Sequence, residues 1–361
     1  MGSGTVVACL GSFSLGMMII FDRLMIADCY RNKPDQAWLV SASAGFLLGT
    51  LATGVTWLLY TAFSPVTLVD LFNSMARLSY PYGIAMVFCG ALCVQVTCHY
   101  FRLFIPQGGR EVNETAIAMW LATTPIWILL ALVIIHLFDL DFLFLGRLED
   151  VNLTKEFAIV VTLTVGALIW FETGDAKQSV PLLASLERNA EILKMLSAIV
   201  GYTVILSSIL RNGDVMTTAG VLALQPFFWA GFIAGVRVLL KKKNRIDFCR
   251  NWRRMKKFLI PTVVAEIIGM TVYYFEFFAL SKVDPTLVNL ITGAHIILVF
   301  IFIAILAKVR QYMERNNIHR LWCLGLRLTG KRLPETSITP RKLLWFLVVL
   351  LSLSCATLLA A

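Results

Sequence analysis

The chain has 361 residues, of which 58% are hydrophobic and only 15% are charged, and its mean hydropathy is +0.77. Soluble domains carry about 25% charged residues, so this composition excludes an ordinary soluble enzyme or binding domain. The net charge of +10 does not predict nucleic-acid binding, because the excess is concentrated in two connectors between apolar runs. We expect an all-α polytopic membrane protein, since a barrel would show short alternating segments instead.

Apolar runs of about 20 residues recur along the chain, and each is long enough to cross ~30 Å of hydrocarbon as a helix. They predict about ten transmembrane helices, at residues 4–25, 37–63, 82–104, 115–138, 156–172, 195–213, 215–240, 258–280, 285–308 and 342–360. The fifth run is at the lower limit of length for crossing, and the tenth stands alone after a long basic connector.

Lys and Arg are distributed unevenly between the two sides of the predicted helices. Of the 32 such residues, 27 fall in alternate connectors, so the positive-inside rule predicts that these connectors are cytoplasmic and both termini are outside. The connectors 237–257 and 308–342 are the most basic, and we expect them to contact anionic lipid head groups. Apolar residues among their charges predict interfacial amphipathic helices. The expected location is the plasma membrane or a bacterial inner membrane.

The chain also aligns with itself. The segments that match are His99 to Phe104 with Tyr273 to Phe278 and, after a three-residue deletion, Thr115 to Ile117 with Thr286 to Val288. This predicts a five-helix repeat at 1–172, a connector at 173–194 and a second five-helix repeat at 195–361. Because five is odd, the second repeat must enter the membrane in the opposite sense, which makes the repeats inverted. Arg102 and Glu276 align, so they should lie near opposite faces and form no ion pair.

Three stretches carry a resemblance to the drug/metabolite transporter superfamily, EamA-like branch, whose members consist of two five-helix repeats: His99 to Ala131, Leu143 to Trp170, and Phe275 to Leu306. Pro125 matches the usual mid-helix proline, whereas Arg147 replaces a common Glu and Ile296 replaces the expected second proline. The resemblance implies a central cavity between the repeats. It also implies cytoplasmic termini, opposite to the charge count. The connector 308–342 is longer than usual and suggests an added surface helix.

An ionisable side chain inside the membrane costs from about 2.5 kcal/mol upward, so those present usually face a cavity or a partner. Glu266 lies well inside the span 258–280, and Gly269, Tyr273 and Glu276 fall on the same helix face. A protonated Glu bonded to a neighbouring group is the structural alternative. Asp22 and Arg23, at the end of the first span, are predicted to be solvated at the interface.

The span 285–308 offers Asn289, Thr292 and His295 at helical spacing, and a histidine there could carry a coupling proton. In the third span Gln95 is nearer the middle than His99 and Arg102. Packing or local hydrogen bonding is an alternative role for each of these residues. The predicted substrate-binding set is Gln95, Trp120, Thr124, Tyr202, Glu266, Tyr273, Asn289, Thr292 and His295.

The sequence holds no nucleophile and base pair, metal motif or glycine-rich phosphate loop, so we predict no enzyme activity, cofactor, catalytic residue or metal ligand. The predicted function is secondary transport of a small polar or amphipathic metabolite by alternating access. The alternative is a lipid flippase, or an enzyme for lipid-linked substrates that would use the acidic cluster Asp139, Asp141, Glu149 and Asp150. Substrate identity, direction, coupling ion and oligomeric state are not predicted.

Overall fold

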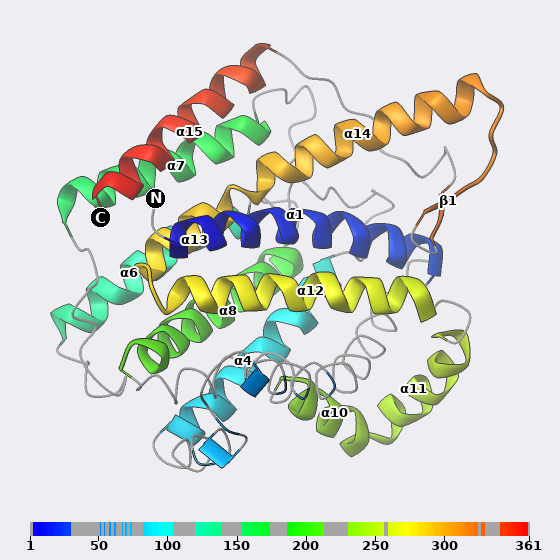
Figure 1. Ribbon diagram of the computed structural model, residues 1–361, viewed down its shortest axis with the longest axis horizontal. Helices are drawn as coiled ribbons and strands as arrows, with labels where there is room; N and C mark the ends of the chain where they lie inside the picture. Colours follow the sequence, from blue (N-terminus) through cyan, green and yellow to red (C-terminus); the bar gives the residue numbers. More distant parts are fainter. Residues whose placement is uncertain are drawn as a thin grey trace.

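The computed structural model describes residues 3–29, 82–103, 120–138, 154–173, 186–212, 230–255, 259–323, 326–328 and 340–359, with isolated positions between 51 and 73. Within these ranges the chain is almost wholly helical (Figure 1). Seven of the described helical segments are long and apolar enough to cross a membrane. The prediction of an all-α polytopic membrane protein is therefore confirmed at this level.

The helices that match predicted spans are α1 (Ser3–Cys29), α4 (Tyr82–Leu103), α6 (Thr124–Leu137), α7 (Lys155–Thr173), α8 (Leu186–Asn212), α10 (Ala230–Leu240), α12 (Leu259–Leu280), α13 (Pro285–Gly293), α14 (His295–Arg315) and α15 (Pro340–Leu359). The predicted span 37–63 falls almost entirely outside the described residues, as do residues 215–229 of the seventh span. The fifth run forms α7 but is not among the seven candidates for crossing.

The two basic connectors have different structures. The first forms helix α11 (Lys242–Met255), as predicted. In the second, α14 continues to Arg315 and an antiparallel hairpin follows, built of β1 (Leu321–Cys323) and β2 (Leu326–Leu328). The predicted surface helix is therefore wrong for residues 316–323 and 326–328, while 324–325 and 329–339 lie outside the described residues. Strand periodicity explains the hairpin, because Leu326 and Leu328 point to the same side and are both buried.

Helices from distant parts of the chain form the closest pairs. α1 packs along α12, α4 along α8, and α7 along α15, and α1 also contacts α13 and α14 (Figure 1). The first pair is antiparallel, because Gly4 lies against Val283 whereas Gly269 lies against Met18. Both termini lie at one end of the molecule, and α11 and the hairpin lie at the other end (Figure 1).

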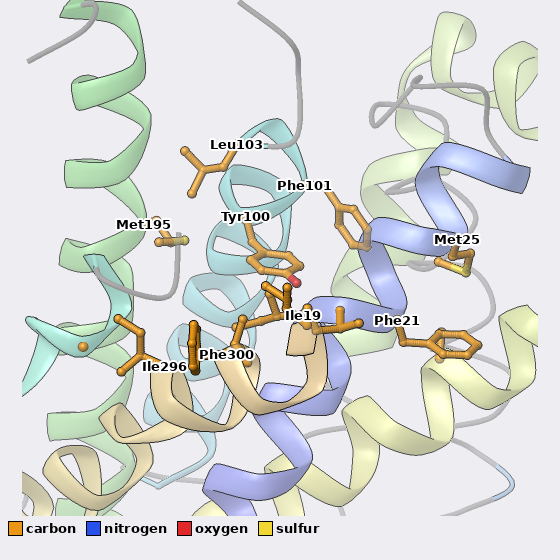
Figure 2. Packing of buried hydrophobic residues seen from close by; sticks show 14 of the residues in the cluster. Ile19, Phe21, Met25, Tyr100, Phe101, Leu103, Met195, Ile296 and Phe300 are labelled. Atoms are coloured by element: carbon orange, nitrogen blue, oxygen red, sulfur yellow. The ribbon is translucent and has the colours of Figure 1, made fainter. Parts of the chain in front are cut away.

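The largest apolar core lies where α1, α4, α8 and α14 meet. Figure 2 shows Ile19 of α1, Tyr100 of α4, Met195 of α8 and Phe300 of α14 converging on one another. All four side chains are buried. This core holds α1 and α4 of the first half of the chain against α8 and α14 of the second half.

At Gly16, α1 packs closely against α14. A Cβ there would lie 3.1 Å from Leu298 Cβ and 3.4 Å from the Phe302 ring, whereas a Cβ at Gly166 on α7 would meet nothing within 4 Å. We expect Gly16→Ala to be less stable than Gly166→Ala by about 1–3 kcal/mol, because overpacking acts only at the first site and the gain in helix propensity is the same. Thermal unfolding of the two purified variants in detergent measures this difference, and equal stability would contradict the packing.

Candidate functional site

The helical segment 120–138 is interrupted at Thr123. There the backbone bonds span three residues, because Thr123 N–H donates to the Trp120 carbonyl (3.1 Å) and Ile126 N–H donates to the Thr123 carbonyl (3.1 Å). Pro125 has no N–H, so the Leu121 carbonyl loses the donor that an α-helix would supply. The Thr124 hydroxyl replaces that donor and bonds the Leu121 carbonyl at 2.6 Å.

The helical segment 285–315 is interrupted at Ala294 in the same way. Ala294 N–H donates to the Ile291 carbonyl (3.1 Å), and Ile297 N–H donates to the Ala294 carbonyl (3.0 Å). The Thr292 carbonyl is bonded by a side chain, because His295 Nδ1 lies 2.7 Å from it. Although no proline follows Ala294 as Pro125 follows Thr123, both interruptions have the same hydrogen-bond spacing and both central residues keep right-handed helical dihedrals.

The two interruptions also fall at equivalent positions of the internal alignment. When the match of Thr115 with Thr286 is continued without a gap, Thr123 aligns with Ala294 and Thr124 aligns with His295. Each of the latter two side chains bonds the carbonyl three residues before it. The correspondence therefore extends from the sequence to individual hydrogen bonds.

The interrupted segments touch each other at this level, and we call this contact the crossing. A Cβ at Gly293 would lie 3.5 Å from Ala122 Cα and 3.6 Å from the Ala122 carbonyl oxygen. Gly293 therefore lets the two backbones approach closely. Ala122 is itself fully buried, so no solvent reaches the contact from that side.

Buried polar groups surround the crossing on the side of α13 and α14. The Ser12 hydroxyl of α1 donates to the Thr292 carbonyl at 3.4 Å, and Asn289 Nδ2 donates to the Pro285 carbonyl at 3.0 Å. Two polar atoms, Thr292 Oγ1 and His295 Nε2, are buried without a hydrogen-bond partner among the described residues. Because His295 Nδ1 must donate to a carbonyl, Nε2 of the neutral ring is a hydrogen-bond acceptor.

A second polar group, which we call the aromatic cluster, consists of Cys93, Tyr202, Tyr273, Glu276 and Phe277. The Cys93 thiol donates to the Tyr273 hydroxyl (3.2 Å), and the Phe277 ring lies 5.8 Å from that of Tyr202 and 6.1 Å from that of Tyr273. Glu276 interacts electrostatically with the hydroxyl groups of both tyrosines. The cluster joins α4, α8 and α12.

The predicted site residues thus fall into groups. Asn289, Thr292 and His295 lie on one interrupted segment, and Trp120 and Thr124 lie on the other. Tyr202 and Tyr273 belong to the aromatic cluster, and the structure leaves Gln95 on α4 and Glu266 on α12 at half-buried positions. Site assignments for these residues remain predictions.

The structure contradicts one prediction, for Asp22, and shows one cluster of charged residues, around Glu191, that was not predicted. Asp22 is 5% exposed and interacts with the Tyr100 hydroxyl, so the prediction of interfacial solvation is wrong. Glu191 of α8 contacts His99 and also binds Arg102 (3.4 Å) and Lys194 (3.3 Å). This cluster was missed because Glu191 precedes the predicted span 195–213, whereas α8 begins at Leu186.

Comparison with known proteins shows a similarity of fold. No protein-family model and no curated protein matches the chain. A solved structure described as a crystal structure of a protein matches 98% of this chain and 97% of its own, with a TM-score of 0.53 and 12% sequence identity. At this identity the match shows a shared fold alone, and the class of the chain is a polytopic helical membrane protein.

Thr292→Val removes a buried hydroxyl that lacks a partner among the described residues and preserves the side-chain shape. Since such a group costs about 1–3 kcal/mol, we expect this variant to be as stable as the wild type or more stable. Thr164→Val is the matched control, because the Thr164 hydroxyl is equally buried but donates to the Val160 carbonyl at 2.7 Å. Thermal unfolding in detergent compares them, and an equal loss of stability in both variants would contradict the assignment.

Proposed function

We propose that the chain is a secondary transporter with ten membrane-spanning helices in two inverted five-helix repeats. It would move a small polar or amphipathic metabolite by alternating access. The observation that carries the proposal is the matched pair of helix interruptions at Thr123 and Ala294, which meet at the crossing. Interrupted helices at mid-depth are where transporters of this architecture bind cargo, because polar groups there have no solvent to pair with.

The helix pairing supports the inverted repeat. A two-fold axis requires that a residue on the axis contact its own equivalent, and Ala122 aligns with Gly293 and touches it. The same two-fold rotation would superpose the pair α1 and α12 on the pair α8 and α4. It would superpose the pair α7 and α15 on itself, with the two helices exchanged. All three pairs are among the most extensive helix contacts.

The crossing supplies the chemistry that such a cargo needs. His295 Nε2 offers an acceptor and the Thr292 hydroxyl offers a donor or acceptor, both of them buried. Tyr202 and Tyr273 offer apolar walls with polar ends. An imidazole at this depth could also take up a coupling proton. The resemblance of three stretches to EamA-like transporters points to the same function.

The charge distribution supports one orientation. The basic α11 and the basic hairpin connector lie at the end of the molecule opposite the termini (Figure 1). The positive-inside rule would place that end in the cytoplasm of a plasma membrane or bacterial inner membrane. Lys241, Lys242, Lys243 and Arg245 are all exposed there. We therefore expect α11 to lie against anionic lipid head groups.

Substitutions at His295 separate its structural role from its proposed functional role. His295→Thr reproduces the arrangement at Thr124, so it should keep the Thr292 carbonyl bonded while removing the Nε2 acceptor. We expect this variant to fold and to lose uptake. His295→Ala removes the side-chain donor to the Thr292 carbonyl, which the Ser12 hydroxyl also bonds at 3.4 Å, and should be less stable by about 0.5–1.5 kcal/mol. Uptake by proteoliposomes, measured together with thermal unfolding, distinguishes the variants, and full uptake by His295→Thr would contradict the assigned role.

A disulfide lock tests alternating access. A Cβ at Gly4 would lie 3.8 Å from Val283 Cβ, which is within the usual range for a disulfide. We expect the variant Gly4→Cys with Val283→Cys to stop uptake when oxidised and to recover it on reduction, because the bond ties α1 of one repeat to the turn that follows α12 in the other.

The cargo for this assay is a ¹³C-labelled extract of polar metabolites, and mass spectrometry identifies what accumulates in proteoliposomes. Protein-free vesicles and each single-cysteine variant are the controls. The proposal fails if no compound accumulates above the protein-free level, or if the oxidised double variant transports as well as the reduced one.

A further inference from the structure

We propose that the cargo is positively charged, an organic ammonium ion, and that Glu276 in the aromatic cluster is its counter-ion. This inference rests on the proposed function and specifies its substrate class. In the sequence Glu276 belongs to the polar face of its helix and aligns with Arg102 of the first half.

Glu276 lies inside the predicted membrane span Ile260–Leu280 of α12. α1 covers one side of it at close range, because a Cβ at Gly11 would lie 3.4 Å from Phe275 Cβ and 3.9 Å from the Glu276 backbone nitrogen. The other helices near the carboxylate are α4, which contributes Cys93, and α8, which contributes Tyr202. The group is therefore enclosed by helices from both halves of the chain.

The groups that interact with the Glu276 carboxylate in the described part of the chain are neutral or acidic. They are the Cys93 thiol and the hydroxyls of Tyr202 and Tyr273. The cation that aligns with Glu276 in the first half of the chain, Arg102, is bound to Glu191 instead. Among the described residues, no Lys or Arg forms an ion pair with Glu276.

A carboxylate inside a membrane protein is unfavourable unless an opposite charge stabilises it. A cationic ligand would supply a charge that no described Lys or Arg supplies. Glu276 and Tyr273 are both only partly buried. An anionic cargo would be repelled by the same group.

The aromatic rings favour the same class of ligand. Ammonium ions are attracted to the faces of aromatic rings within about 6 Å of the centroid. The rings of Tyr202, Phe277 and Tyr273 pack at centroid distances of 5.8 Å and 6.1 Å, and Tyr273 lies about one helical turn before Glu276 on α12. A carboxylate with neighbouring aromatic rings is the combination that binds alkylated ammonium ions.

Binding to the purified full-length protein in detergent tests the ligand class without requiring transport. The probes are tetramethylammonium, choline and benzyltrimethylammonium, with 3,3-dimethylbutanol as the neutral isostere of choline. We expect saturable binding of at least one ammonium ion, about tenfold tighter than the neutral isostere. Glu276→Gln should weaken it by about tenfold or more, and Glu276→Asp should keep the preference for cations.

Glu156→Gln is the matched control, because Glu156 is exposed on α7 and belongs to neither the crossing nor the aromatic cluster. Size-exclusion chromatography verifies that each variant is folded. If Glu276→Gln does not fold, the relative affinity of Glu276→Asp for ammonium ions and for the neutral isostere is the test. The inference is overturned if no ammonium ion binds more tightly than the neutral isostere, or if Glu276→Gln binds the ions as the wild type does.

Uptake by proteoliposomes separates this inference from the proposed function. Ammonium binding that depends on Glu276, without any uptake, would refute transport and leave the ligand class standing. Uptake of a neutral or anionic metabolite without ammonium binding would support transport and overturn the ligand class.

Discussion

Backbone carbonyls inside hydrocarbon must be hydrogen-bonded within the protein, and this constraint governs the centre of the molecule. At each interruption of a spanning helix a side chain donates to one carbonyl, that of Leu121 in one segment and that of Thr292 in the other. Thr124 and His295 make these bonds from three residues further along the chain. Because these carbonyls are bonded locally, the interrupted segments remain inside the apolar region and can touch at Ala122 and Gly293.

The two ring nitrogens of His295 therefore have different environments. One ring nitrogen is occupied by the backbone, which fixes the tautomer and the orientation of the ring. The other is buried and directed away from that bond. Thr124 performs the structural task in the first segment with a hydroxyl alone, so an imidazole is not required for it. The difference between the two segments is therefore the acceptor atom that only the second segment provides.

Much of the architecture could be predicted from the sequence, because the length of an apolar run determines whether it can cross a membrane. α4 and α12, for example, begin and end within a residue of the predicted spans. The interruption at Thr123 had a signal in Pro125, but the one at Ala294 has no proline. It depends on a bond from His295 to a carbonyl three residues earlier, which spacing alone does not reveal.

Interactions between helices were harder to predict, because the pattern of one helix does not identify its neighbour. In the sequence Asp22 has the position of an interfacial residue, at the end of an apolar run. In the structure it interacts with Tyr100 of α4. Glu191 precedes the apolar run of its helix, and the pairing of α8 with α4 adds His99 and Arg102 to its partner on the same helix, Lys194. The hairpin after α14 was missed for a related reason, since its buried leucines are explained by the surface on which they pack.

The two halves of the chain are joined by unlike chemistry. The end of α4 is held to α8 by charged groups around Glu191, whereas the beginning of α1 meets the end of α12 through Gly4 and Val283. Separating the first pair would release ions that water solvates well, so electrolyte weakens that contact. Separating the second would wet an apolar seam, a cost that grows on warming from low temperature. Ionic strength and temperature therefore act on different ends of the molecule.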